Sequence, residues 1–110
     1  MKGLIIREPW IDYILSGKKV WEIRGSNTTI RGRIALIKSG TSTILGEANL
    51  INSIKLDLSK YYVNKDKHCI DNVDSLPYKN TYGWVLSDVK KYKTPEKYRH
   101  PKGAVIWVNL

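Results

Sequence analysis

The chain has 110 residues, enough for one domain with its own hydrophobic core. Nineteen Lys and Arg residues against ten Asp and Glu residues give a formal net charge of +9, which favours a polyanionic partner, with RNA or DNA first. Alternatively, the positive charge reflects a proteome that uses lysine at most solvated positions and has no functional meaning. This alternative fits because Lys outnumbers Arg and is scattered along the chain. The single cysteine, Cys69, excludes an internal disulfide framework and fits a reducing compartment.

No apolar stretch approaches the length that crosses a bilayer, and the first residues lack the pattern of a signal peptide. We therefore expect a cytoplasmic protein without a membrane partner. The sequence contains no repeat, low-complexity segment or linker, so we expect one domain over residues 1–110.

The first elements are a strand, a helix and a second strand. Leu4–Ile6 is a short buried strand, and Pro9 at the first helical position opens a helix with an apolar face. Gly17 is the expected C-terminal cap of this helix. From Val20 the sequence follows the pattern of a strand, in which successive side chains point to opposite faces. This places Val20 and Glu22 on one side and Trp21 and Ile23 on the other.

The rest of the chain also follows mainly strand patterns. We expect strands over Gly32–Lys38, Thr43–Lys55 with a bulge or turn at Gly46, Tyr82–Val89 and Ala104–Val108, a loop between Pro95 and Pro101, and helical or irregular structure over 56–68. About six strands with one or two flanking short helices predict an α+β fold, a small and mainly antiparallel β-barrel.

Lys19, Glu22 and Arg24, named here the charged clamp, lie within six positions of one another. Glu22 and Arg24 share a face of a regular strand, and Lys19 joins them if the chain is still turning after Gly17. The two cations favour ionised Glu22, and Glu22 favours charged Lys19. An ionised carboxylate of this kind is a poor general base but a good acceptor for an exocyclic amine or ring N–H, while Lys19 and Arg24 suit carbonyl or phosphate oxygens. The pattern therefore favours a binding site over a catalytic site.

A plainer interpretation stands beside each of these assignments. Exposed ion pairs along a strand are common and contribute on the order of 0–1 kcal/mol each. Trp10 and Trp21 are expected in the core, and the functional alternative is an aromatic wall for a flat ligand. Ser39, before Gly40, is a candidate nucleophile or phosphate contact, although such a serine more often satisfies turn geometry.

The densest basic stretch lies in the last quarter of the chain. Basic residues interleaved with tyrosines suit contact with backbone phosphates and stacking on bases. The expected phosphate contacts are Lys90, Lys91, Lys93, Arg99 and Lys102. His68, Cys69 and His100 lack the spacing of a zinc site, and we expect neither a metal nor a cofactor.

Glu8-Pro9, the short helix, Gly17-x-Lys19-x-x-Glu22-x-Arg24 and the later strand Gly83-Trp84-Val85-Leu86 resemble the ASCH domain family of the PUA-like superfamily. The resemblance implies a PUA-like β-barrel with a cleft beside the first helix. It also implies RNA or modified nucleosides as the ligand class.

Some small bacterial members of that family are similar to amidohydrolases that remove the acyl group of N4-acetylcytidine, and others are described as ribonucleases. Lys19 matches the lysine of the amidohydrolase motif. Glu22 stands where that motif has a threonine nucleophile, and a carboxylate cannot replace the hydroxyl. The expected function is therefore RNA or nucleotide binding, with a metal-independent hydrolase using Lys19, Glu22 and Ser39 as the alternative.

Overall fold

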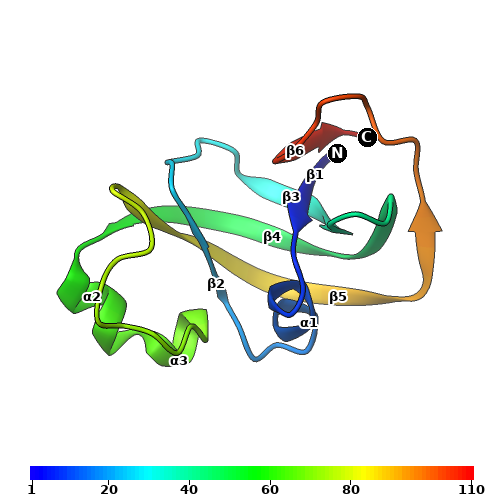
Figure 1. Ribbon diagram of the computed structural model, residues 1–110. Helices are drawn as coiled ribbons and strands as arrows, with labels where there is room; N and C mark the ends of the chain where they lie inside the picture. Colours follow the sequence, from blue (N-terminus) through cyan, green and yellow to red (C-terminus); the bar gives the residue numbers. More distant parts are fainter.

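Six strands form one mixed sheet in the order β2-β5-β4-β3-β1-β6 in the computed structural model, which describes residues 1–110 (Figure 1). The strands are β1 (Lys2–Ile6), β2 (Trp21–Arg24), β3 (Gly32–Lys38), β4 (Thr43–Leu56), β5 (Thr81–Lys97) and β6 (Trp107–Asn109), and the helices are α1 (Trp10–Leu15), α2 (Leu58–Val63) and α3 (Lys65–His68). The predicted α+β class and the six strands are confirmed. There are three short helices rather than one or two.

Four of the five strand pairings are antiparallel, and β1 pairs with β3 in parallel. Backbone pairing does not close the sheet, since β2 and β6 are its two edges. The two sides of the sheet nevertheless approach each other as in a barrel: the guanidinium of Arg24 on β2 reaches the carbonyl oxygen of Ile5 on β1 and donates to it at 2.7 Å. This side chain thus connects two strands that are four places apart in the sheet order.

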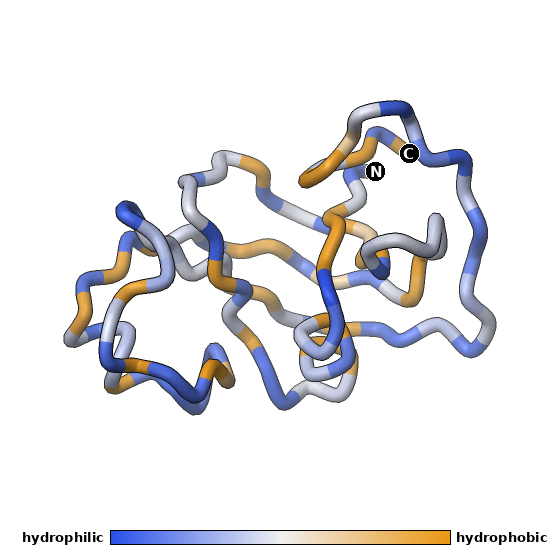
Figure 2. The backbone as a smooth tube through the Cα atoms, in the orientation of Figure 1, coloured by the Kyte–Doolittle hydropathy of each residue, from blue (hydrophilic) through white to orange (hydrophobic).

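The main core lies between α1 and the sheet. Ile11 and Ile14 on one face of α1 are fully buried among side chains of β1, β3, β4 and β5. Gly17, with φ of +83°, ends the helical stretch as expected and turns the chain toward β2. A second cluster, with Trp21, Leu56 and Tyr61, packs β2 against α2. Figure 2 shows hydrophobic segments along the middle of the sheet and a hydrophilic run toward the end of β5.

Three predicted boundaries were wrong. Pro9 precedes α1 as its N-cap residue instead of opening the helix. The expected loop after Pro95 begins later, since β5 continues to Lys97. Pro95 falls within a register shift, between the pairs Gly46–Lys91 and Ile44–Glu96. Because it has no partner there, its missing N–H removes no hydrogen bond between β4 and β5. The last strand occupies Trp107–Asn109 rather than Ala104–Val108.

The segment expected to be helical or irregular contains α2 and α3, whereas Leu56 belongs to β4. The side chain of Asp57 caps α2 by accepting a hydrogen bond from the backbone N–H of Lys60 at 2.8 Å. None of the helices has both the length and the apolar character needed to cross a membrane.

Candidate functional site

A cleft of about 740 Å³ opens between α1, β1 and β2. The turn after β3 and the segments 70–78 and 100–105 complete its walls. Its lining residues are Ile5, Arg7, Trp10, Lys19, Glu22, Ile23, Arg24, Ser39, Gly40, Ile70, Pro77, Tyr78, His100, Ala104 and Val105. The cleft therefore combines apolar walls with three cationic side chains and a single carboxylate.

Lys19 lies at the floor of the cleft, with only 1% of its surface exposed. The turn at Gly17 brings it there, and its backbone N–H donates to the carbonyl oxygen of Tyr13 at 3.0 Å. Its ammonium group donates to the backbone oxygen of His68 and lies 4.9 Å from the centre of the Trp10 ring. The same nitrogen is 3.9 Å from Oε1 of Glu22, so these two side chains share one face although they are three residues apart.

Burial lowers the pKa of Lys19 from 10.5 to about 8, and the opposing charge of Glu22 only partly offsets this effect. The charges near Lys19 predict a stable ammonium group, whereas the hydrolase alternative requires Lys19 to be desolvated, and in the structure desolvation is the larger effect. Lys19 is therefore still mostly protonated at neutral pH, but it titrates far below an ordinary lysine.

One carboxylate oxygen of Glu22 accepts hydrogen bonds from the protein, and the other accepts none. Oε2 accepts hydrogen bonds from Nε of Arg24 at 3.0 Å and from its Nη2 at 2.8 Å. Oε1 accepts no hydrogen bond within the protein, and the ammonium of Lys19 lies 3.9 Å from it. The Arg24 guanidinium also lies 5.5 Å from the centre of the Trp84 ring. The arrangement holds an ionised carboxylate in place and leaves one acceptor oxygen for a ligand.

His68 supports this floor from behind. Its ring is fully buried and stacks on Tyr61 with centroids 4.3 Å apart. Nδ1 accepts a hydrogen bond from the N–H of Ile70 at 3.0 Å, so the proton of the neutral ring is on Nε2, which donates to the carbonyl oxygen of Tyr61 at 2.7 Å. Burial lowers the pKa of His68. No sequence signal identifies this role, because His68 contacts Lys19 across 49 positions of the chain.

The structure places five of the predicted site residues on the same cleft. Trp10 and Ser39 line it together with the charged clamp. Trp21 does not line it and instead packs beside Leu56 and Tyr61, with the Lys67 ammonium 5.2 Å from its ring centre. Arg7 and Tyr78 also line the cleft but lie in segments without a motif, and His100, considered in the sequence only as a metal ligand and as part of the basic stretch, lines it as well.

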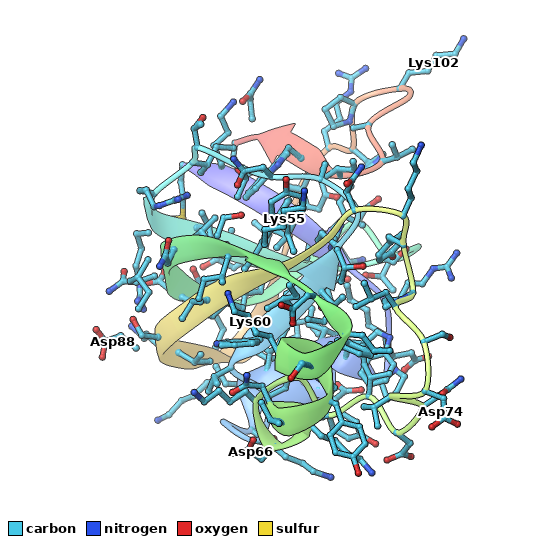
Figure 3. All side chains as sticks on the ribbon, turned by 90° about the vertical axis from the view of Figure 1, so that its left-hand side faces the viewer. Lys55, Lys60, Asp66, Asp74, Asp88 and Lys102 are labelled. Atoms are coloured by element: carbon cyan, nitrogen blue, oxygen red, sulfur yellow. The ribbon has the colours of Figure 1, made fainter.

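The predicted phosphate contacts do not line the cleft. Lys90, Lys91 and Lys93 are exposed on β5, and Arg99 and Lys102 are exposed in the following loop. Figure 3 shows Lys102 projecting away from the body of the molecule. No group of three or more His, Cys, Asp or Glu side chains is placed to hold a metal ion.

The cleft and the sheet can be compared with known proteins. The family model of the ASCH domain matches residues 4–98. Among solved structures, the chain is similar to the ASCH protein of Zymomonas mobilis. A serine-to-alanine variant of it aligns with a TM-score of 0.75 at 14% identity, over 99% of this chain and 87% of that one.

Two further crystal structures of the Zymomonas mobilis protein give the same result. A tyrosine-to-phenylalanine variant has a TM-score of 0.72 at 15% identity, over 99% of this chain and 88% of that one. A third structure, of ASCH with no substitution named, has a TM-score of 0.66 at 15% identity, over 82% and 68%. The curated proteins contain no match. The structural likeness shows a shared fold, and the family model covers most of the sequence, so the chain belongs to the ASCH domain family.

Proposed function

We propose that this ASCH domain binds RNA, or one nucleotide of it, with a base in the cleft and the strand running over its basic surface. The observation that carries the proposal is the state of Glu22: the residue is only 5% exposed, its Oε2 is fixed by Arg24, and its Oε1 is free to accept a hydrogen bond. A buried, oriented acceptor of this kind favours a ligand that brings its own donor.

A nucleobase with an exocyclic amine fits these groups. The amine donates to Oε1 of Glu22, and a ring carbonyl accepts from Lys19, whose ammonium has two protons left after the bond to His68. Trp10 supplies an aromatic ring at the same cleft. The exposed basic residues of β5 and the following loop bind backbone phosphates, which position the strand without reading its sequence.

Glu22→Gln tests this proposal. We expect it to abolish preference for an amine-bearing base, because the side-chain amide of the variant can present a donor toward Lys19 and toward the amine of the ligand. Binding of short single-stranded RNAs that differ in one base is measured by titration at two salt concentrations. Asp74→Asn, at an exposed residue that neither lines the cleft nor lies on β5, is the control for the change in net charge. Unchanged affinity of Glu22→Gln for every RNA would contradict the charged clamp.

A metal-independent hydrolase is the second candidate, and the lowered pKa of Lys19 is the observation that favours it. An amine that titrates near 8 exchanges protons more readily near neutral pH than an ordinary lysine. Glu22 is the only carboxylate that lines the cleft, and the hydroxyl of Ser39 is the only aliphatic hydroxyl there. A nucleophile other than the threonine of the amidohydrolase motif is therefore required.

Incubation with N4-acetylcytidine and with RNA, followed by separation of the products, tests the second candidate. Product formation that is lost in Lys19→Met and in Ser39→Ala supports a hydrolase. Intact substrates together with salt-sensitive binding support the binding module alone.

A further inference from the structure

The rim of the cleft carries hydrogen-bond donors that no group of the protein uses. The guanidinium of Arg7 is exposed and takes part in no hydrogen bond or ion pair. The hydroxyl of Ser39 and the backbone N–H of Gly40 likewise have no acceptor. All three residues line the cleft, two of them on the turn that follows β3 and one just after β1.

The rim and the floor of the cleft differ in charge balance. At the floor, Lys19 and Glu22 line the cleft with little exposed surface, and the carboxylate is paired with Arg24. At the rim, Arg7, Ser39 and Gly40 are exposed, and no carboxylate lines the cleft beside them. The charge of Arg7 is therefore not balanced by any carboxylate of the cleft. Together with the neighbouring donors that have no acceptor, it favours an anion with several acceptor oxygens.

A second hollow of about 190 Å³ adjoins this rim and shares Ile5, Gly40 and His100 with the cleft. Its other walls come from Ile37, Lys38, Thr41, Ser42 and Tyr98. The shared residues make the rim a boundary between two adjacent spaces. A phosphate bound at Gly40 therefore lies next to both spaces.

We propose that Arg7, Ser39 and Gly40 form a phosphate subsite, so that the cleft takes a nucleotide rather than a free nucleoside. The inference rests on the proposed function, since it assumes a nucleobase at the charged clamp. The guanidinium donates to two unesterified oxygens of the phosphate, and the Ser39 hydroxyl and the Gly40 N–H donate to the same oxygens or, in a terminal phosphate, to the third. A terminal phosphate and a phosphodiester of RNA share this chemistry.

Arg7→Gln tests the subsite. Isothermal titration is carried out with guanosine and cytidine, with their 3′- and 5′-monophosphates, and with the dinucleotides of each base. In the wild-type protein, we expect one monophosphate to bind at least about tenfold more tightly than its nucleoside at low salt. Arg7→Gln should remove most of this advantage and leave nucleoside affinity unchanged. Arg31→Gln is the matched control, because Arg31 is exposed and does not line the cleft.

The outcomes separate the subsite from the proposed function. Equal affinity for nucleoside and monophosphate in the wild-type protein, or equal losses in Arg7→Gln and Arg31→Gln, would overturn the subsite while base binding stands. Binding of no nucleoside, nucleotide or dinucleotide, or binding that Glu22→Gln leaves unchanged, would overturn the proposed function and the subsite with it. If the subsite is present, a dinucleotide that binds more tightly than the monophosphate identifies a phosphodiester of RNA, and one that binds less tightly identifies a terminal phosphate.

Discussion

Lys19 keeps an ammonium group at the floor of a cleft, where burial opposes the charge. The nearby partners are the oxygen of His68, the Trp10 ring and Glu22, and together they do not compensate for the lost solvation, since the pKa falls to about 8. The unfolded chain retains an ordinary lysine. Lys19 therefore makes the stability of the fold depend on pH in the alkaline range.

Between pH 8 and 10.5 the unfolded chain holds the Lys19 proton and the folded chain releases it, so the free energy of unfolding rises with pH. We expect the wild-type protein to gain about 2 kcal/mol relative to Lys19→Met between pH 7.5 and 9.5. Urea unfolding of both proteins at the two pH values measures this difference. Lys18→Met removes the exposed lysine that precedes Lys19, and its pH profile should follow that of the wild type. Parallel pH profiles for Lys19→Met and the wild type would contradict the burial of a titrating amine.

His68 gives a pH dependence on the acidic side. Its pKa is lowered chiefly by burial, with the hydrogen bond to the Tyr61 oxygen and Asp66 opposing and the charges of Lys19 and Lys65 adding to the shift. As the pH falls below 6.5, the unfolded chain takes up the proton first, so stability decreases. The loss can reach about 1.4 kcal/mol per pH unit for one group.

A charged His68 cannot accept from the N–H of Ile70, because both ring nitrogens then carry protons. We expect the protection factor of the Ile70 amide against hydrogen exchange to fall between pH 7 and 5, while amides in the centre of β4 stay protected. In His68→Gln, the loss of stability over the same range should be smaller. An Ile70 protection factor that does not change with pH would show that His68 stays neutral throughout.

At the scale of elements, Arg24 determines how β2 meets the rest of the fold. It donates twice to Glu22 on its own strand and once to Ile5 on β1, although β5, β4 and β3 lie between these strands in the sheet. One side chain thus holds the curl of the sheet and the orientation of the carboxylate in the cleft.

Arg24→Met leaves the Glu22 carboxylate without its main partner and the Ile5 oxygen without a donor. We expect a loss of about 2–4 kcal/mol in the free energy of unfolding, since removing one member of a largely buried ion pair exposes the full desolvation cost of the other. Urea unfolding measures it. Arg31→Met, in an exposed loop, should cost less than about 1 kcal/mol. Similar losses for both variants would mean that Arg24 acts as an ordinary surface residue.

The elements could be predicted where a local rule determines them. The apolar face of α1 and the glycine at position 17 locate the helix, and alternation of side chains puts Glu22 and Arg24 on one face of β2. The parallel pairing of β1 with β3 has no local signal, because it depends on which strand edges remain open after folding. A proline usually ends a paired strand, so the sequence predicts a loop from Pro95, whereas the bulge that accommodates this residue depends on the register with β4.

The site could be predicted only in part. The spacing of Lys19, Glu22 and Arg24 is visible in the sequence, but the depth of Lys19 is not, since it comes from the distant segment around His68 and from Trp10. Arg7 has no motif, and its position at the cleft follows from the path of the chain between β1 and α1. Long-range packing therefore decides the chemistry of these residues.

At the scale of the whole molecule, the excess positive charge is spread over several surfaces. Lys90 and Lys91 are exposed on β5, whereas Lys55 and Lys60 lie at the α2 end of the molecule (Figure 3). These two pairs carry equal charge, so substituting each in turn separates a local contact with RNA from the general attraction of a basic protein.

The double variant Lys90→Gln and Lys91→Gln should weaken binding of single-stranded RNA regardless of its sequence. If both lysines contact phosphates, the slope of log affinity against log salt concentration should become shallower by about 1.4. Titration at several salt concentrations gives the slope. The pair Lys55→Gln and Lys60→Gln should leave the slope nearly unchanged. Equal changes for the two pairs would indicate that β5 is only a solvated face.

The walls of the cleft come from opposite ends of the sequence, with Ile5 and Arg7 on one side and His100, Ala104 and Val105 on the other. Pairing of β1 with β6 also joins these ends. During synthesis, the charged clamp therefore leaves the ribosome long before the wall that completes the cleft. Ligand binding is expected to begin only after residues near 105 have emerged, so a nascent chain cannot be stabilised by its ligand while its core is still forming.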